Sequence, residues 1–173
     1  MEKGYFQVYT GNGKGKTTAA LGMAFRALGH GLTVYIGQFM KGQDYGELKS
    51  ARKFPALTIE RFGEERFILN DGRIDERAAR LAEAGLQRGS EALLSGKFDL
   101  VILDEINVAL YFKLLDLGNV VALIKAKPAG TELVFTGRNA PGEILELADL
   151  VTEMKEVKHY FQQGIQARIG IEK

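Results

Sequence analysis

The sequence predicts an α/β fold in which a mostly parallel sheet carries helices on both faces. Short apolar segments rich in β-branched and aromatic residues alternate with longer segments whose apolar residues have helical spacing. A glycine-rich loop lies between the first predicted strand and the first predicted helix. With 173 residues the chain is long enough for one compact domain with a substantial core. We therefore expect a single domain over residues 1–173.

The predicted strands and helices alternate along the whole chain. Strands are expected at residues 5–9, 33–38, 57–62, 100–103, 132–136 and 150–154, and helices at 16–28, 75–94, 117–126 and 141–147. The first helix ends at Gly29-His30-Gly31, which is a common helix-terminating pattern. The third helix stops before Pro128, and Pro141 suits the first turn of the fourth. No repeat or linker interrupts this order.

The glycine-rich loop is a predicted phosphate-binding loop, so the expected fold is of the phosphate-loop NTPase type. Its predicted ligand-binding residues are Gly11, Asn12, Gly13, Lys14, Gly15, Lys16, Thr17 and Thr18. The glycines allow successive backbone N–H groups to turn toward phosphate oxygens, and the following helix directs its positive end at the same anion. Lys16 adds a positive charge, and Thr17 offers a hydroxyl to Mg²⁺. The general pattern has glycine where this chain has Thr10. A glycine-rich turn without a ligand is the alternative, and the flanking strand and helix favour the phosphate loop.

Composition excludes several other classes of function. Lys and Arg number 23 and Asp and Glu 22, so the net charge of +1 gives no basic footprint for nucleic acid. The absence of cysteine excludes disulfides, thiolate catalysis and cysteine-ligated metals. The N-terminus lacks the apolar core of a signal peptide, and no apolar segment approaches the roughly 20 residues that cross a bilayer. We expect a soluble, cytoplasmic protein without membrane or nucleic-acid partners.

Polar residues follow three further predicted strands. Asp104 and Glu105 come directly after the apolar strand at 100–103, as in a Walker B strand, and Arg138 follows the strand at 132–136. A third polar segment, Gln38-Phe39-Met40-Lys41-Gly42, follows the strand at 33–38. Since parallel strands present their carboxyl ends at one edge of the sheet, these loops are expected to share a site with the phosphate loop. One carboxylate is expected to hold Mg²⁺ directly and the other through water or a hydrogen bond. Taken alone, each segment also fits an ordinary loop after a buried strand.

Together these segments resemble the ATP:corrinoid adenosyltransferases of the bacterial phosphate-loop type. The resemblance rests on residues 10–18, Gln38-Phe39-x-Lys41-Gly42, Leu103-Asp104-Glu105, Thr136-Gly137-Arg138, Glu146-Leu147-Ala148-Asp149, Val157-Lys158-His159, Gly164-Ile165-x-Ala167 and Ile169-Gly170-Ile171-Glu172. It spans nearly the whole chain, keeps the family's order and spacing, and includes threonine at position 10. The C-terminal part carries weight because phosphate-loop proteins in general do not share it.

The resemblance implies transfer of the adenosyl group of ATP to a corrinoid. Cobalt in the +1 state would attack the 5′-carbon of ATP, and tripolyphosphate would leave. Lys16 and Glu105 would be catalytic, Thr17 and Glu105 would hold Mg²⁺, and Arg138 would bind ATP. ATP would lie reversed relative to other phosphate-loop enzymes. The implied partners are ATP, the corrinoid, a flavin-based reductant and a second copy of the chain in a homodimer.

The chain also departs from the family pattern. Many relatives have a longer N-terminal arm over the active site, whereas the first strand here is expected almost at once. Relatives often carry a tryptophan after the third strand that touches the corrin, and this chain has none. Phe67 is the candidate corrinoid contact in the corresponding segment, with simple packing as the alternative. His159 is expected to have a structural role rather than to ligate cobalt.

Two other functions are compatible with the motifs. The first is a phosphate-loop ATPase or nucleotide switch acting on a partner, with Glu105 activating water. The second is a small-molecule kinase. The three hypotheses differ in their products: tripolyphosphate for adenosyl transfer, ADP and phosphate for an ATPase, and ADP with a phosphorylated acceptor for a kinase.

Overall fold

The computed structural model describes residues 2–42, 45–64 and 75–172. Within this part of the chain the strands are β1 (Phe6–Thr10), β2 (Val34–Phe39), β3 (Leu57–Phe62), β4 (Leu100–Asp104), β5 (Glu132–Thr136) and β6 (Leu150–Glu153). They form one sheet in the order β3-β2-β4-β5-β1-β6. Every neighbouring pair is parallel. The predicted parallel α/β sheet is therefore confirmed.

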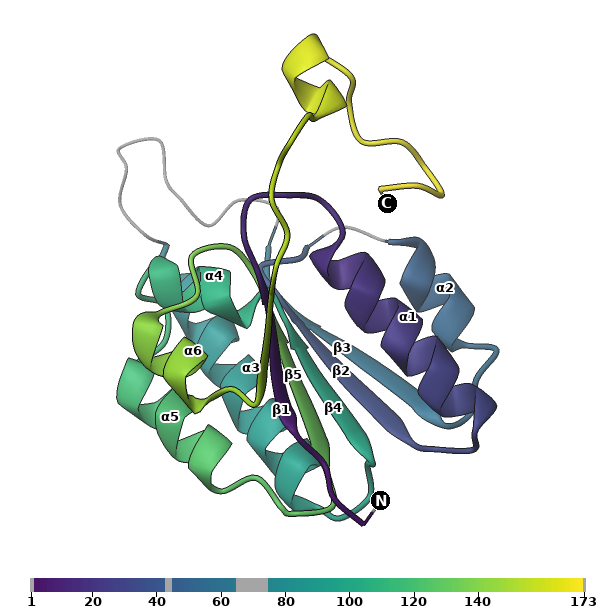
Figure 1. Cartoon of the computed structure of the whole chain (residues 1–173), viewed down its shortest axis with the longest axis vertical. Coiled ribbons are helices and arrows are strands. Elements are labelled where there is room, and N and C mark those ends of the chain that lie inside the picture. The colour runs from purple at the N-terminus through teal and green to yellow at the C-terminus, as the bar shows by residue number, and fades with distance from the viewer. Residues whose placement is uncertain (1, 43–44, 65–74, 173) are drawn as a thin grey trace.

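Helices cover both faces of the sheet, as predicted (Figure 1). One face carries α1 (Lys16–Gly29) and α2 (Gly46–Ala51), and the other carries α3 (Glu76–Leu94), α4 (Ile106–Tyr111), α5 (Leu117–Lys125) and α6 (Gly142–Leu147). The expected end of α1 is confirmed, because Gly31 takes a left-handed φ of 76° and its N–H donates to Leu28 O. The helices α2 and α4 were not predicted. Each has only six residues, too few to show a helical period.

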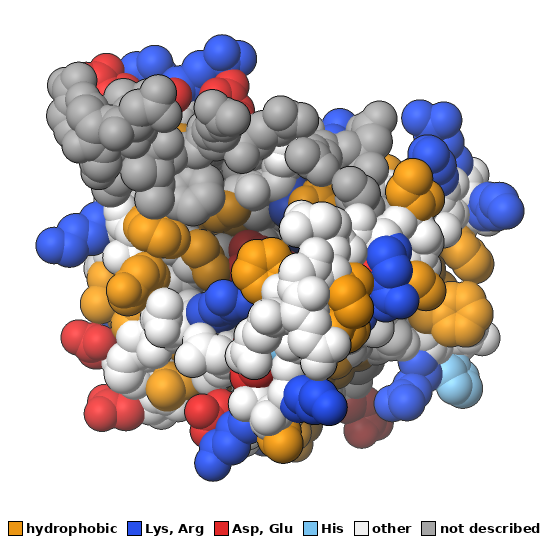
Figure 2. Space-filling view, turned by 90° about the horizontal axis from the view of Figure 1, so that it is seen from above, with side chains coloured by type: hydrophobic (Ala, Val, Ile, Leu, Met, Phe, Trp, Pro, Cys, Tyr) orange, Lys and Arg blue, Asp and Glu red, His pale blue; other side chains and the backbone are white. Residues whose placement is uncertain are grey.

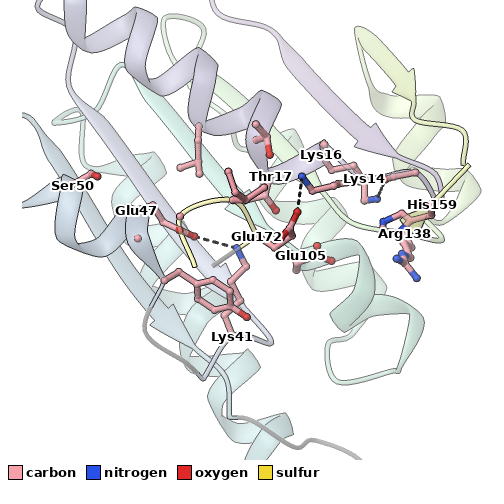
Figure 3. A pocket seen from close by; sticks show the side chains of 18 residues that line it. Lys14, Lys16, Thr17, Lys41, Glu47, Ser50, Glu105, Arg138, His159 and Glu172 are labelled. Carbon is pink, nitrogen blue, oxygen red and sulfur yellow. Dashed lines mark hydrogen bonds and ion pairs between the residues drawn. The ribbon is translucent and has the colours of Figure 1, made fainter. Parts of the chain in front are cut away.

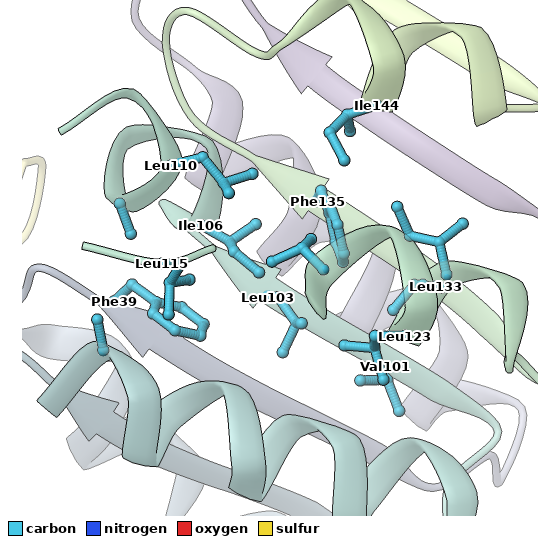
Figure 4. Close-up of a cluster of buried hydrophobic side chains, with 14 of the residues drawn as sticks. Phe39, Val101, Leu103, Ile106, Leu110, Leu115, Leu123, Leu133, Phe135 and Ile144 are labelled. Carbon is cyan, nitrogen blue, oxygen red and sulfur yellow. The ribbon is translucent and has the colours of Figure 1, made fainter. Parts of the chain in front are cut away.

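The core consists of two layers of side chains, one on each face of the sheet. On the side of α3 to α6, Phe6 and Val8 of β1 belong to the same cluster as residues of β4 and β5. Figure 4 shows Leu103 of β4 and Phe135 of β5 in this cluster. The rings of Phe6 and Phe135 meet edge to face with centroids 4.8 Å apart. The alternate residues of the same strands pack against α1. Burial of both faces explains why these strands read as continuous apolar segments.

The carboxyl ends of the strands all lie at one edge of the sheet, beneath the C-terminal segment (Figure 1). After β6 this segment crosses that edge, forms a 3₁₀ helix at Tyr160–Gln163 and returns toward α1 and α2. Most of its side chains are exposed. Figure 2 looks down on the edge, where basic and apolar side chains both reach the surface. In the described ranges, no helix has the length and apolarity to span a membrane.

Candidate nucleotide-binding site

A cavity of about 600 Å³ opens at the carboxyl edge of the sheet, a size within the roughly 300–1,000 Å³ typical of ligand sites (Figure 3). Of the predicted ligand-binding residues, it is lined by Gly13, Lys14, Gly15, Lys16, Thr17, Thr18, Glu105 and Arg138. Gly11 and Asn12 form the beginning of the same loop. The remaining lining residues belong to four parts of the chain: Leu21 of α1, the loop after β2, helix α2 and the C-terminal segment. The structure thus brings the predicted loops together around one space.

The phosphate loop is held in shape by left-handed glycines and by the chain beyond β6. Gly11 and Gly15 have φ values of 92° and 120°, which residues with a side chain rarely adopt. Gly13 N donates to Met154 O over 2.6 Å, and a Cβ on Gly13 would lie 2.7 Å from that oxygen. Helix α1 starts at Lys16 without a side-chain cap. Its first-turn N–H groups and positive dipole end therefore face the cavity as an anion site.

Lys16 is folded into its own loop. Its Nζ donates to Gly11 O over 2.8 Å and to Gly13 O over 2.7 Å, and the side chain is buried. Burial lowers the pKa of this ammonium below its ordinary value, while the charge of Glu105 opposes the shift. The ammonium is thus paired only with neutral carbonyl oxygens in these two hydrogen bonds. A bound phosphate would give it the charged partner that strengthens such contacts.

Asp104 is the central residue of the hydrogen-bond network beneath the cavity. Its carboxylate is 1% exposed. Oδ1 accepts hydrogen bonds from the hydroxyls of Thr17 over 2.9 Å and Thr136 over 2.6 Å. Oδ2 lies 2.8 Å from Lys41 Nζ and accepts a hydrogen bond from Gln38 over 3.3 Å. The buried charge is therefore paired and fully hydrogen-bonded, which is what stabilises a carboxylate at such a site.

Glu105 lines the cavity from the turn between β4 and α4. Its backbone is left-handed, with φ 63°, and its N–H donates to Thr136 Oγ1 over 2.9 Å. A non-glycine residue in this conformation costs free energy, and such strain often occurs at functional sites. Burial raises the pKa of the Glu105 carboxyl, and the neighbouring charge of Asp104 raises it further. Thr136 therefore orients both acidic residues.

Lys41 reaches Asp104 because the chain turns sharply after β2. Met40 has φ 59°, and Gly63 packs so closely that a Cβ there would lie 2.4 Å from Lys41 N. Glu47 of α2 completes the network, since its Oε1 accepts from Gln38 over 2.9 Å and lies 3.4 Å from Lys41 Nζ. The sequence singled out Lys41 but not Glu47. No local pattern marks Glu47, because the helix that carries it was itself not predicted.

The C-terminal segment supplies the remaining wall of the cavity through His159, Gly170, Ile171 and Glu172. Nδ1 of His159 accepts a hydrogen bond from Phe161 N over 3.0 Å, which caps the 3₁₀ helix and agrees with the structural role expected for this histidine. Glu172 lies 3.3 Å from Lys14 Nζ of the phosphate loop. Sequence reasoning assigned no role to Glu172.

The donor atoms beside the phosphate loop suit Mg²⁺. Thr17, Asp104 and Glu105 offer only oxygen ligands, which this ion prefers. Across residues 2–42, 45–64 and 75–172, no three His, Cys, Asp or Glu side chains converge into a metal-binding cluster. A metal at this site would therefore rely on one or two protein oxygens and the phosphates of a nucleotide, as Mg²⁺ commonly does. The assignment of Thr17 and Glu105 as its ligands stays a prediction.

Comparison with known sequences decides the family. The family described as ATP:corrinoid adenosyltransferase BtuR/CobO/CobP matches residues 2–172. The chain belongs to this family of enzymes. It is 42% identical to a corrinoid adenosyltransferase of Pseudomonas aeruginosa, covering 99% of this chain and 84% of that protein. It is 37% identical to corrinoid adenosyltransferase CobA of Salmonella typhimurium, covering 99% and 86%.

A solved structure supports the fold independently of the family. The flagellar accessory protein FlaH of Methanocaldococcus jannaschii superimposes with a TM-score of 0.58 at 13% identity, covering 88% of this chain and 72% of that one. At this identity the likeness concerns the fold alone.

Phe67, the predicted corrinoid contact, lies outside the described residues.

Proposed function

We propose that the chain transfers the 5′-deoxyadenosyl group of ATP to the cobalt(I) centre of a corrinoid. The electron pair of cobalt forms a bond to the 5′-carbon, the bond from that carbon to oxygen breaks, and its electrons leave with tripolyphosphate. The product is an adenosylcorrinoid, as in the synthesis or salvage of adenosylcobalamin. The protein needs no nucleophile of its own for this step, in keeping with a chain that lacks cysteine.

The observation that carries the proposal is the set of cations that surrounds the space beside the phosphate loop. Lys14, Lys16 and Arg138 line the cavity together with the first turn of α1. Because negative charge develops on the departing triphosphate, fixed cations and N–H groups at this position lower the barrier. The same groups hold ATP in one orientation, which lowers the entropic cost of the attack.

Thr17 and Glu105 are the proposed protein ligands of Mg²⁺, with Asp104 orienting the Thr17 hydroxyl. When bound, Mg²⁺ would neutralise charge on the leaving triphosphate. Glu105 must be ionised to serve as a ligand, and the charge of Lys16 favours that form against the effect of burial. ATP would lie with its 5′-carbon toward the open side of the cavity, where the corrinoid approaches.

Several partners complete the proposed reaction. The corrinoid is the second substrate, and a flavin-based reductant delivers cobalt in the +1 state. The chain is proposed to work as a cytoplasmic homodimer. The corrinoid follows from the relatives' names, the reductant and the homodimer follow from the family resemblance, and the cytoplasmic location follows from the sequence, in which neither a signal peptide nor a membrane span is recognised.

Analysis of the products tests the proposed function. Purified protein is incubated with Mg²⁺ and ATP, with and without chemically reduced cobalamin, and the phosphate-containing products are separated by ion exchange. Tripolyphosphate and adenosylcobalamin are expected in equal amounts, and only when reduced cobalamin is present. Release of ADP and phosphate without a corrinoid would instead establish an ATPase, and ADP with a phosphorylated acceptor would establish a kinase.

A further inference from the structure

The C-terminal segment is tied to the phosphate loop at both of its ends. At its beginning, Met154 O accepts the hydrogen bond from Gly13 N over 2.6 Å. Near its end, Glu172 Oε1 lies 3.3 Å from Lys14 Nζ (Figure 3). Between these points the side chains of residues 161–171 are exposed and none contributes to the buried core. The contact between Glu172 and Lys14 is therefore a main anchor of the returning end of this segment on the loop.

Glu172 is held in place as an ionised carboxylate. Its Oε2 accepts a hydrogen bond from Arg168 N over 2.8 Å, its Oε1 lies 3.1 Å from Arg168 Nη2, and the Tyr160 hydroxyl donates to it as well. The side chain of Glu172 is only 13% exposed, whereas that of Lys14 is 41% exposed. Hydrogen bonds from Arg168, with the larger effect, and from Tyr160 lower the pKa of Glu172 below its ordinary value. The segment thus presents a preformed negative charge to the loop.

A triphosphate and Glu172 would compete for the same ammonium. Both Lys14 and Glu172 line the cavity, alongside the loop residues that would surround the phosphates. The triphosphate is attracted to Lys14, and it is repelled by the carboxylate beside it. Lys16 instead donates its hydrogen bonds to Gly11 O and Gly13 O, which are neutral oxygens of the phosphate loop itself. Of these two lysines, Lys14 is therefore the one whose availability depends on the C-terminal segment.

We propose that Glu172 is a positioning residue that holds Lys14 in the ligand-free protein and yields it to the incoming triphosphate. Polyphosphate binding at the loop then weakens the docking of residues 158–172, and their docking weakens polyphosphate binding by the same factor. The inference rests on the proposed function only in requiring that the loop bind a polyphosphate. Departure of tripolyphosphate would restore the contact, so Glu172 would also help to expel the product.

Two measurements with inorganic tripolyphosphate and Mg²⁺ test this coupling without any corrinoid. The first is the dissociation constant by calorimetry, and the second is hydrogen exchange of peptides covering residues 158–172. In the wild type, tripolyphosphate should accelerate exchange in these peptides. Glu172→Gln should exchange rapidly with or without the ligand and bind tripolyphosphate about two- to five-fold more tightly, as expected for loss of one exposed ionic contact.

Two further variants separate the coupling from a general loosening of the segment. Lys14→Gln keeps the contacts of Glu172 with Arg168, so fast exchange that no longer responds to tripolyphosphate would support the proposal. Glu156→Gln serves as the matched control, because Glu156 accepts from Gln162 over 2.5 Å within the segment. It should behave as the wild type does in both measurements.

Slower exchange on ligand binding in the wild type would overturn the proposal, since the segment would then close over the triphosphate. An unchanged dissociation constant in Glu172→Gln would overturn it too. These outcomes are independent of the adenosyl transfer assay. Coupling without product formation would disprove the proposed function alone.

Discussion

The hydroxyl of Thr17, in the first turn of α1, donates a hydrogen bond to Asp104 Oδ1, at the end of β4, over 2.9 Å. This contact joins the phosphate loop to the acidic strand end and fixes the direction of the hydroxyl's lone pairs. Because Asp104 also accepts from Thr136, Gln38 and Lys41, its carboxylate has little freedom to rotate. Asp104 therefore orients the proposed metal ligand Thr17, and Glu105 is the carboxylate that lines the cavity.

Thr17→Ala is expected to raise the Mg²⁺ concentration needed for half-maximal ATP binding by about tenfold or more, because one oxygen ligand is lost. Thr17→Ser keeps the hydroxyl and should stay close to the wild type. Calorimetric titration of ATP at a series of Mg²⁺ concentrations measures the effect. An identical Mg²⁺ dependence in Thr17→Ala would remove this residue from the coordination shell.

Lys16→Ala is expected to slow adenosyl transfer by about 10²- to 10³-fold, the usual effect of losing one preorganised donor at a developing charge. Lys125→Ala, which removes an exposed lysine at the end of α5, is the matched control and should retain the wild-type rate. The rate of adenosylcobalamin formation is followed by absorbance. A near-normal rate in Lys16→Ala would refute the assigned role.

Glu105→Gln separates a metal ligand from a residue that activates water. As a ligand, glutamine keeps an oxygen but loses the charge, so adenosyl transfer should weaken and partly recover at high Mg²⁺. Products are quantified for wild type and variant across a Mg²⁺ series, with and without reduced cobalamin. Corrinoid-independent phosphate release by the wild type that disappears in the variant would favour the ATPase instead.

Gly63→Ala is expected to destabilise the protein by about 1–3 kcal/mol, because the new methyl group would overlap the backbone at Met40 and Lys41. Gly22→Ala is the matched control. It lies on the exposed side of α1, where an added Cβ meets nothing within 4 Å, and it should stabilise by about 0.5–1 kcal/mol. Urea denaturation gives both free energies of unfolding. Equal effects of the two substitutions would contradict the packing described around Lys41.

Asp99→Ala is expected to lower the free energy of unfolding by about 1–2 kcal/mol at pH 7, since two hydrogen bonds from Thr33 are lost. Both hydrogen bonds lower the folded-state pKa of Asp99 below its ordinary value of 3.8, and the one from the Thr33 backbone N–H has the larger effect. A lowered pKa contributes stability that is full well above pH 3.8 and is lost as the pH falls through the folded-state value. The difference between wild type and variant in urea should therefore shrink in acid. If the difference in free energy of unfolding between wild type and Asp99→Ala did not change with pH, the effect would come from packing rather than from the carboxylate charge.

The strands and long helices were predictable because their signals are local. The expected strands at 57–62 and 132–136 coincide with β3 and β5, and the other four differ by one residue at one or both ends. The expected helix at 75–94 begins one residue later, since Asp75 is its cap and accepts from Arg77 N. The short helices α2 and α4 were not predicted, because six residues are too few to show a helical period of apolar residues.

The site was predictable as a set of loops but not as a set of contacts. The sequence indicates that Asp104, Lys41 and Arg138 each follow a strand, and the parallel sheet brings those ends together. It does not contain the strand order, which places β4 between β2 and β5 and so brings Lys41 and Thr136 to opposite oxygens of Asp104. The contact of Glu172 with Lys14 joins two distant parts of the chain without any local pattern.

The position of β1 in the sheet has a consequence for biosynthesis. Among the described residues β1 pairs with β5 and β6, which leave the ribosome after β2, β3 and β4. During translation the phosphate loop therefore emerges early but lacks both neighbours, while β2, β3 and β4 already have partners among themselves. Pairings so distant in sequence form slowly, because a long loop must close first. A nascent chain would acquire affinity for nucleotide only after β5 and β6 have emerged.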